Sequence, residues 1–132
     1  MPAKDYRELR VYQLAFETAL RIFDISKKFP PEERYSLTDQ IRRSSRSVCS
    51  SIAEAWPLRE RRYPASFVSK LSDSDSESAE TSVWLDFCKA FGFISEKEHA
   101  EIADHYDHIC SQLAIMMAEP DKWCPANSKR KA

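Results

Sequence analysis

The stretch LTDQIRRSSRSVCSSIAEAW, residues 37–56, decides the fold. Its apolar or small residues recur every three or four positions, the spacing that keeps side chains on one side of an α-helix. The arginines of the stretch fall between these positions. It therefore predicts a helix with a core-facing seam and a separate basic face. The seam comprises Leu37, Ile41, Ser44, Ser45, Val48, Ile52 and Ala55.

Three further segments carry helical spacing. Residues 9–28 hold two adjacent apolar stripes, and Pro30-Pro31 ends them. Residues 64–92 run from a proline suited to a first helical turn to Gly92, which can take the left-handed conformation at a helix end. Residues 95–117 open with a Ser-Glu-Lys-Glu capping box and continue as a regular apolar stripe. That stripe comprises Ile102, Tyr106, Ile109, Leu113 and Met116.

Two local questions stay open in this pattern. The helix of the decisive stretch starts at Ser36, where Asp39 completes a capping-box-like S-x-x-D. It either stops near Trp56 or continues kinked past Pro57, because proline costs one backbone hydrogen bond. The alternating Ser and acidic residues of 72–78 could form a flexible linker. A helix is favoured there, because apolar spacing resumes at once and the serines of the second helix offer a matching small surface.

The expected fold is all-α, an antiparallel up-down-up-down four-helix bundle, because short connections force consecutive long helices to be antiparallel neighbours. The bundle domain would span residues 1–118, and residues 119–132 would form a partly disordered C-terminal tail. The single glycine leaves no P-loop or dinucleotide-binding loop. The two stripes of 9–28 exceed what one core needs, so they indicate either a subunit contact or a helix buried on both flanks.

The distribution of apolar residues indicates the cellular compartment of the protein. No run in the sequence approaches the roughly 18 apolar residues of a membrane span, and the N-terminus has no apolar segment of signal-peptide type. We therefore expect a cytoplasmic protein that is not bound to a membrane. Its cysteines are then expected to be reduced thiols, the first three of them as small buried residues. They are Cys49, Cys88, Cys110 and Cys124.

The sequence contains few candidate metal ligands or catalytic residues. His105 and His108, with Asp104 and Asp107, could in principle hold a metal. Histidines on a solvated helix face are far commoner than metal-binding ones. The sequence contains neither the residue pattern of a di-iron site nor that of a catalytic triad. We therefore expect no metal, no cofactor and no catalytic residue.

Three segments carry a family resemblance. They are RELRVYQLA at 7–15, FPPEERYSLTDQIRR at 29–43 and SIAE at 51–54. In this order they resemble the four-helix-bundle proteins named for the intervening sequences of 23S ribosomal RNA. The resemblance covers roughly residues 5–117. The family usually has Asn-Ile-Ala-Glu-Gly where this chain has Ser51-Ile-Ala-Glu-Ala55, and the segment WPLRERRY that follows is a departure of its own.

The resemblance implies a four-helix bundle that assembles as a ring of five, a pentamer, with no enzymatic activity attached. It also implies a relation to the accessory protein of diversity-generating retroelements, a basic pentamer that binds a reverse transcriptase and nucleic acid. The partners expected on this basis are further copies of the chain, RNA or DNA, and a reverse transcriptase. The ribosomal label carried by some members reflects gene location more than demonstrated binding.

Charge along the chain is bipolar. Residues 36–70 hold seven Lys and Arg against three Asp and Glu, whereas residues 71–107 hold two against ten. The arginines could form a basic face for nucleic acid, with Trp56 and Tyr63 available for base stacking. The acidic segment could equally pair with them, within a protomer or between neighbours in a ring. The candidate nucleic-acid or assembly face comprises Arg42, Arg43, Arg46, Arg59, Arg61 and Arg62.

Glu54 and Glu80 interrupt or flank apolar seams, so each needs a partner if it is partly buried. Arg43 is the natural candidate, which predicts a structural ion pair. The leading functional hypothesis is a non-enzymatic oligomeric scaffold or adaptor that could associate with RNA or a nucleic-acid enzyme through the basic second helix. The alternative is a protein-protein interaction module without nucleic-acid binding.

Overall fold

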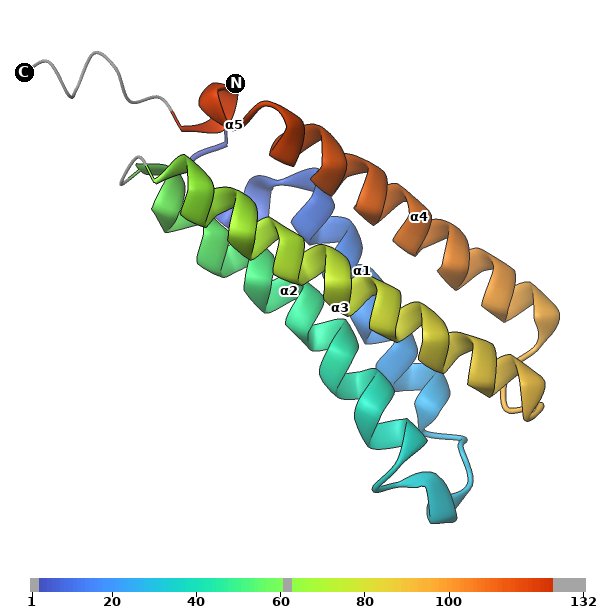
Figure 1. Ribbon diagram of the computed structural model, residues 1–132. Helices are drawn as coiled ribbons and strands as arrows, with labels where there is room; N and C mark the ends of the chain where they lie inside the picture. The colour runs from blue at the N-terminus through green and yellow to red at the C-terminus, as the bar shows by residue number, and fades with distance from the viewer. Residues whose placement is uncertain (1–2, 61–62, 125–132) are drawn as a thin grey trace, which may run out of the picture.

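Four long helices make up the protein, whose computed structural model describes residues 3–60 and 63–124. Neighbouring long helices run antiparallel (Figure 1), so the predicted all-α, up-down-up-down four-helix bundle is confirmed. Short 3-10 turns precede α1 and α2, and one short helix follows α4. In chain order the elements are η1 (Tyr6–Glu8), α1 (Arg10–Ser26), η2 (Pro31–Glu33), α2 (Leu37–Glu60), α3 (Pro64–Ala90), α4 (Glu96–Ala118) and α5 (Pro120–Trp123).

The start and end of α2 answer one open question and correct one expectation. The helix continues through Pro57 to Glu60. At its start Ser36 does not form the expected box with Asp39, because its hydroxyl donates to Glu33 Oε1 at 2.6 Å. The same Glu33 oxygen accepts the backbone N–H of Leu37 at 3.3 Å. The glutamate of the preceding turn therefore takes the place of a serine cap, since it reaches the unpaired N–H groups of the first helical turn.

The α2–α3 contact is the most extensive in the bundle. The serine-rich middle of α3 is helical, so the linker interpretation of 72–78 is wrong. Ser74 Oγ donates to the backbone carbonyl of Val48 at 2.8 Å, and Thr81 Oγ1 donates to Ser44 Oγ at 2.8 Å. Small side chains allow the two backbones to approach, and hydroxyl hydrogen bonds replace apolar contacts between them. The buried hydroxyl residues on the two helices are Thr38, Ser44, Ser45, Ser51, Ser74, Ser78 and Thr81.

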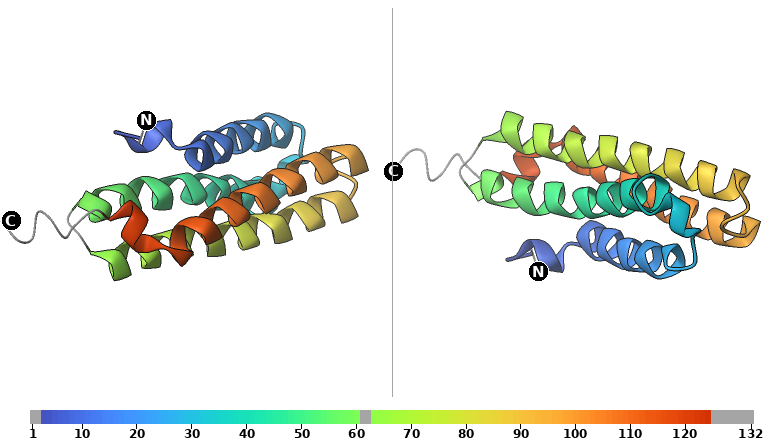
Figure 2. Two further views of the ribbon diagram at one scale, coloured as in Figure 1. Left: turned by 90° about the horizontal axis from the view of Figure 1, so that it is seen from above. Right: turned by 90° about the horizontal axis from the view of Figure 1, so that it is seen from below.

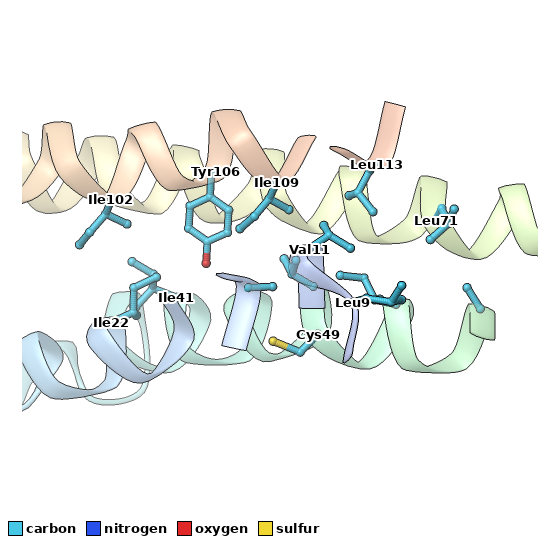
Figure 3. Close-up of a cluster of buried hydrophobic side chains, with 14 of the residues drawn as sticks. Leu9, Val11, Ile22, Ile41, Cys49, Leu71, Ile102, Tyr106, Ile109 and Leu113 are labelled. Atoms are coloured by element: carbon cyan, nitrogen blue, oxygen red, sulfur yellow. The ribbon is translucent and has the colours of Figure 1, made fainter. Parts of the chain in front are cut away.

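α4 supplies one wall of the core as predicted. Ser95 Oγ accepts the Glu98 N–H at 3.0 Å, and Glu98 Oε1 accepts the Ser95 N–H at 2.9 Å, which completes the capping box. Figure 3 shows Ile102, Tyr106 and Ile109 pointing from α4 toward α1 and α2. These three side chains are at most 1% exposed. The regular spacing of the stripe therefore corresponds directly to the buried side of this helix.

α1 packs against the bundle with one of its two apolar sides. The views in Figure 2 place α2 between α1 and α3. The buried side of α1 carries Val11, Ala15, Thr18, Ile22 and Ser26. The neighbouring stripe leaves Phe16, Leu20 and Phe23 exposed by 47%, 55% and 38%. Burial of this helix on both flanks is therefore wrong for the isolated chain, which leaves part of its apolar surface uncovered.

The packed domain extends beyond the expected boundary at residue 118. α5 follows α4 directly, and Trp123 packs against the core while Cys124 is only 3% exposed. Their apolar surface explains why the chain folds back here. The remainder of the predicted tail, 125–132, lies outside the described residues. Within the described residues no helix is long and apolar enough to cross a membrane.

Candidate functional site

Adjacent arginines of α2 reach different neighbours. Arg42 Nε donates to Ser26 Oγ at 2.7 Å, and its guanidinium lies 4.5 Å from the centroid of the Phe23 ring on α1. Arg43 instead pairs with Glu80 and lies 3.7 Å from a carboxylate oxygen of Glu77, both on α3. Consecutive helical residues point about 100° apart, so one side chain turns to each flank of α2. Both cations have partners within the chain.

The remaining arginines do not complete one continuous face. Arg46 is exposed and has no ion-pair partner among the described residues. Arg59 lies about 20 Å further along the helix axis than Arg46, at the helical rise of about 1.5 Å per residue. Its guanidinium stacks 4.0 Å from the centroid of the Trp56 ring. Arg61 and Arg62 lie outside the described residues. The four described arginines are therefore in four different surroundings.

The two aromatic residues expected to stack on bases differ in exposure. Trp56 is only 7% exposed and Arg59 covers its ring, because it lies on the buried side of α2. The expectation of a base-stacking Trp56 is therefore corrected. Tyr63 is 57% exposed at the start of α3.

The acidic residues expected near Arg43 are also divided. Glu80 Oε2 contacts Arg43 and accepts the indole N–H of Trp84 at 3.0 Å. The side chain of Glu54 is 58% exposed and lies 3.5 Å from Lys70 Nζ on α3. It is neither partly buried nor paired with Arg43, since the two are about three helical turns apart. The Glu54–Lys70 contact is an exposed ion pair of little energetic weight.

The histidines do not converge on a site. His99 Nε2 lies 2.8 Å from Asp86, and His105 Nδ1 lies 3.3 Å from Thr18 Oγ1. His108 contacts Asp104 at 3.5 Å. Among the described residues no three His, Cys, Asp or Glu side chains are grouped to hold a metal ion.

Three of the cysteines, Cys49, Cys88 and Cys110, are thiols of low reactivity that form no disulfide among the described residues. Burial raises the pKa of Cys49 to about 11 and that of Cys88 to about 12. Cys110 is only half-buried, and its surroundings still raise its pKa to about 11, mainly through desolvation. Thiols with such pKa values stay protonated near neutral pH and are poor nucleophiles.

Three regions of the described structure expose apolar surface, and the first is a groove between α1 and α2. Its volume is about 610 Å³. Stacked and edge-on rings form its wall, with centroids 4.9 Å apart for Tyr6–Tyr12 and 5.9 Å apart for Tyr12–Phe16. We call it the α1–α2 groove. It is lined by Tyr6, Tyr12, Phe16, Ala19, Leu20, Phe23, Arg46, Cys49, Ser50 and Ala53.

A second apolar face runs along the C-terminal half of α3. Val83, Phe87 and Phe91 recur every four residues and are exposed by 48%, 45% and 55%. Ring contacts join Trp84 to Phe87 at 6.1 Å, Phe87 to Phe91 at 5.8 Å and Phe91 to Phe93 at 5.6 Å. We call these five residues the α3 ridge. The ridge and the α1–α2 groove lie on different helices and share no residue.

A third hollow opens where the start of α1, the end of α2 and the end of α4 meet. Its volume is about 890 Å³. Its floor includes Leu9, Val11, Trp56 and Met116, none of them more than 7% exposed. Ile115, which is 65% exposed, lies in its wall. We call it the bundle-end pocket.

This pocket could not be predicted from the sequence. Its lining comes from residues 3–11, 56–59 and 112–123, which only the tertiary fold brings together. The one local signal was Trp123, an aromatic residue just beyond the last predicted helix.

Comparisons with known proteins agree with this architecture. The sequence profile of the 23S rRNA-intervening sequence proteins matches residues 7–114. A similar solved structure is a protein of unknown function from the S23 ribosomal protein family of Bacteroides thetaiotaomicron, with 27% sequence identity and a TM-score of 0.72. The alignment covers 82% of this chain and 95% of that chain. No curated protein matches the chain.

Proposed function

Because the chain belongs to the family of 23S rRNA-intervening sequence proteins, we propose that it is a non-enzymatic scaffold that assembles with further copies of itself. One observation carries the proposal. The chain exposes two separate apolar faces, the α1–α2 groove and the α3 ridge. Large contiguous apolar patches are rare on monomeric proteins and mark sites of association. A cytoplasmic location suits this role, since the thiols of Cys49, Cys88 and Cys110 form no disulfide among the described residues.

The two faces support a head-to-tail contact, in which the ridge of one copy enters the groove of the next. The ridge is a row of aromatic side chains, and the groove is hollow with an aromatic wall. Charge supports the same pairing, because Arg46 lines the groove while the ridge lies on α3, a helix with more acidic than basic residues that carries Asp86 beside the ridge. Repeated head-to-tail contacts close into a ring when the rotation between neighbouring copies divides a full turn evenly. We propose a ring of five, the number that the family resemblance implies.

The arginines of α2 support assembly better than they support phosphate binding. Arg42 and Arg43 are engaged by α1 and α3, which leaves a weaker field for a polyanion. Association with RNA, DNA or a reverse transcriptase stays a prediction. It is tested by binding to RNA and DNA across a salt series, with Arg42, Arg43 and Arg46 replaced by Ala. Absence of affinity at low salt would exclude direct contact with nucleic acid.

Light scattering coupled to gel filtration tests the assembly. The wild-type chain of 15.3 kDa is expected at five times this mass. Phe16→Glu in the groove and Phe87→Glu in the ridge are each expected to give a folded monomer, because a charge replaces apolar contact surface. Tyr35→Glu is the matched control, since Tyr35 is 85% exposed and lies outside both faces. A monomeric wild type at micromolar concentration would overturn the proposal.

Mixing the two variants tests the head-to-tail geometry. Phe16→Glu keeps an intact ridge and Phe87→Glu keeps an intact groove, so the mixture is expected to form a one-to-one dimer. Failure to form this dimer, or unchanged assembly of Phe87→Glu alone, would show that the ridge does not enter the groove.

A further inference from the structure

We infer that the bundle-end pocket binds a single-chain amphipathic carboxylate, an apolar chain that ends in one carboxylate group. The pocket shares no residue with the α1–α2 groove or the α3 ridge, so this site is independent of the proposed assembly. Three properties support the inference: an apolar interior of suitable size, a cationic rim, and donors without acceptors.

The interior suits an apolar chain. A volume of about 890 Å³ lies within the range of roughly 300 to 1,000 Å³ that is typical of small-molecule sites. Leu9, Trp56 and Met116 line the pocket and belong to the hydrophobic core. Ile115 exposes most of its surface at the wall, and covering it with an apolar chain would be favourable.

The rim suits an anion. Four cationic side chains line the pocket, Lys4, Arg10, Arg59 and Lys122, against the two carboxylates Glu8 and Glu119. Lys122 and Glu119 neutralise each other at 3.1 Å. Glu8 accepts the backbone N–H of Lys4 at 3.0 Å. Arg10 is exposed and has no ion-pair partner among the described residues, so its guanidinium can meet a ligand carboxylate.

Donors at the pocket lack acceptors. α1 begins here, and Leu9 at its N-cap position provides no side-chain hydrogen bond. The first turn of α1 carries no acidic residue, so its N–H groups and the positive end of the helix dipole are uncompensated. A carboxylate is the ligand group that satisfies such donors.

Isothermal titration of the full chain with dodecanoate tests the site, below the concentration at which micelles form. We expect saturable binding of one dodecanoate per chain. Dodecyltrimethylammonium has the same chain length and a cationic head, and it should bind at least tenfold more weakly. Arg10→Glu should weaken dodecanoate binding at least tenfold, whereas Arg34→Glu, at an exposed arginine outside the pocket, should change it less than twofold.

Ile115→Glu provides a second variant, since this side chain is exposed and its replacement leaves the core intact. It should also weaken dodecanoate at least tenfold, with unchanged helical circular dichroism. Equal binding of the anionic and cationic amphiphiles would overturn the inference, because the rim would then recognise no charge. Undiminished binding to Arg10→Glu, or no saturable binding to the wild type, would overturn it as well. Oligomer mass measured on the same samples keeps this result separate from the assembly test.

Discussion

α2 meets its two flanking helices in different ways. Against α3 it presents small residues, and buried hydroxyls such as Ser74 and Thr81 join the two helices directly. Against α1 the contact is less extensive, and Phe16 and Leu20 of α1 remain exposed. The α2–α3 contact buries the surfaces that form it, whereas the α1–α2 contact leaves apolar surface of α1 exposed to another molecule. In this bundle, small side chains make the close α2–α3 contact that stabilises the fold, whereas large side chains on α1 stay exposed and are available for association.

The largest expected effect comes from enlarging a residue in the close contact. Ser74→Leu should lower the free energy of unfolding by about 3 kcal/mol, because no space exists for the added carbons and the bond to Val48 is lost. Urea unfolding measures the change. Ser72→Leu, at an exposed position of the same helix, should change the free energy by no more than about 0.5 kcal/mol. Equal effects at the two positions would show that α2 and α3 are not closely packed.

A smaller effect should distinguish the hydroxyl of Thr81, which joins α3 to α2, from that of Thr18, which joins α1 to α4. Thr81→Val removes a buried donor and should cost about 1 to 2 kcal/mol, since Ser44 loses a partner that water cannot replace. Thr18→Val on α1 should cost less, because the half-exposed His105 that it contacts can turn to water. Chemical denaturation of both variants gives the comparison. A larger loss for Thr18→Val would reverse our ranking of the two contacts.

The helices could be predicted from the sequence, but the side that each helix turns toward its neighbours could be predicted only in part. Ile102 to Met116 has one apolar side, so the buried stripe of α4 could be identified without a structure. α1 has two apolar sides, and the structure buries the one that contains Thr18 and Ser26 while Phe16 is exposed. Which side meets α2 depends on tertiary packing. The directions of the α2 arginines depend on the same placement.

Alkaline pH should destabilise the bundle through buried thiols on α2 and α3. Desolvation raises the pKa of Cys49 on α2 and of Cys88 on α3, to about 11 and about 12, from an ordinary value of 9.0. A group with a raised pKa in the folded state stabilises that state below its unfolded pKa and loses this contribution as pH rises toward the folded value. We expect the free energy of unfolding to fall between pH 9 and pH 11. Cys49→Ala and Cys88→Ala should each reduce this fall, and an unchanged fall in both would assign it to other groups.

The smallest expected change in the folded chain itself is at the exposed side of α1. Leu20→Gln should leave the unfolding midpoint of the dilute protein nearly unchanged, since Leu20 is 55% exposed. If copies associate through the groove, the wild-type midpoint should rise with protein concentration, and Leu20→Gln should flatten this dependence. Thermal unfolding at several concentrations measures both. A concentration-independent wild type would argue against any stabilising association.

The connections of α1 also set an order of opening. Its polar ties to α4, Thr18 with His105 and Arg21 with Glu101, close loops of 87 and 80 residues. The α2–α3 bond from Ser74 to Val48 spans only 26 residues. Each doubling of a loop costs about 0.6 kcal/mol of chain entropy, so the ties of α1 to α4 should form late in folding. Arg42 and Ser26, which join α2 to α1, are only 16 residues apart, but the α1–α2 contact is less extensive than the α2–α3 contact, so α1 should be the first long helix to detach in the native state. Cys49 lines the groove beneath α1, and its rate of alkylation would therefore report how often this helix lifts away from the other three.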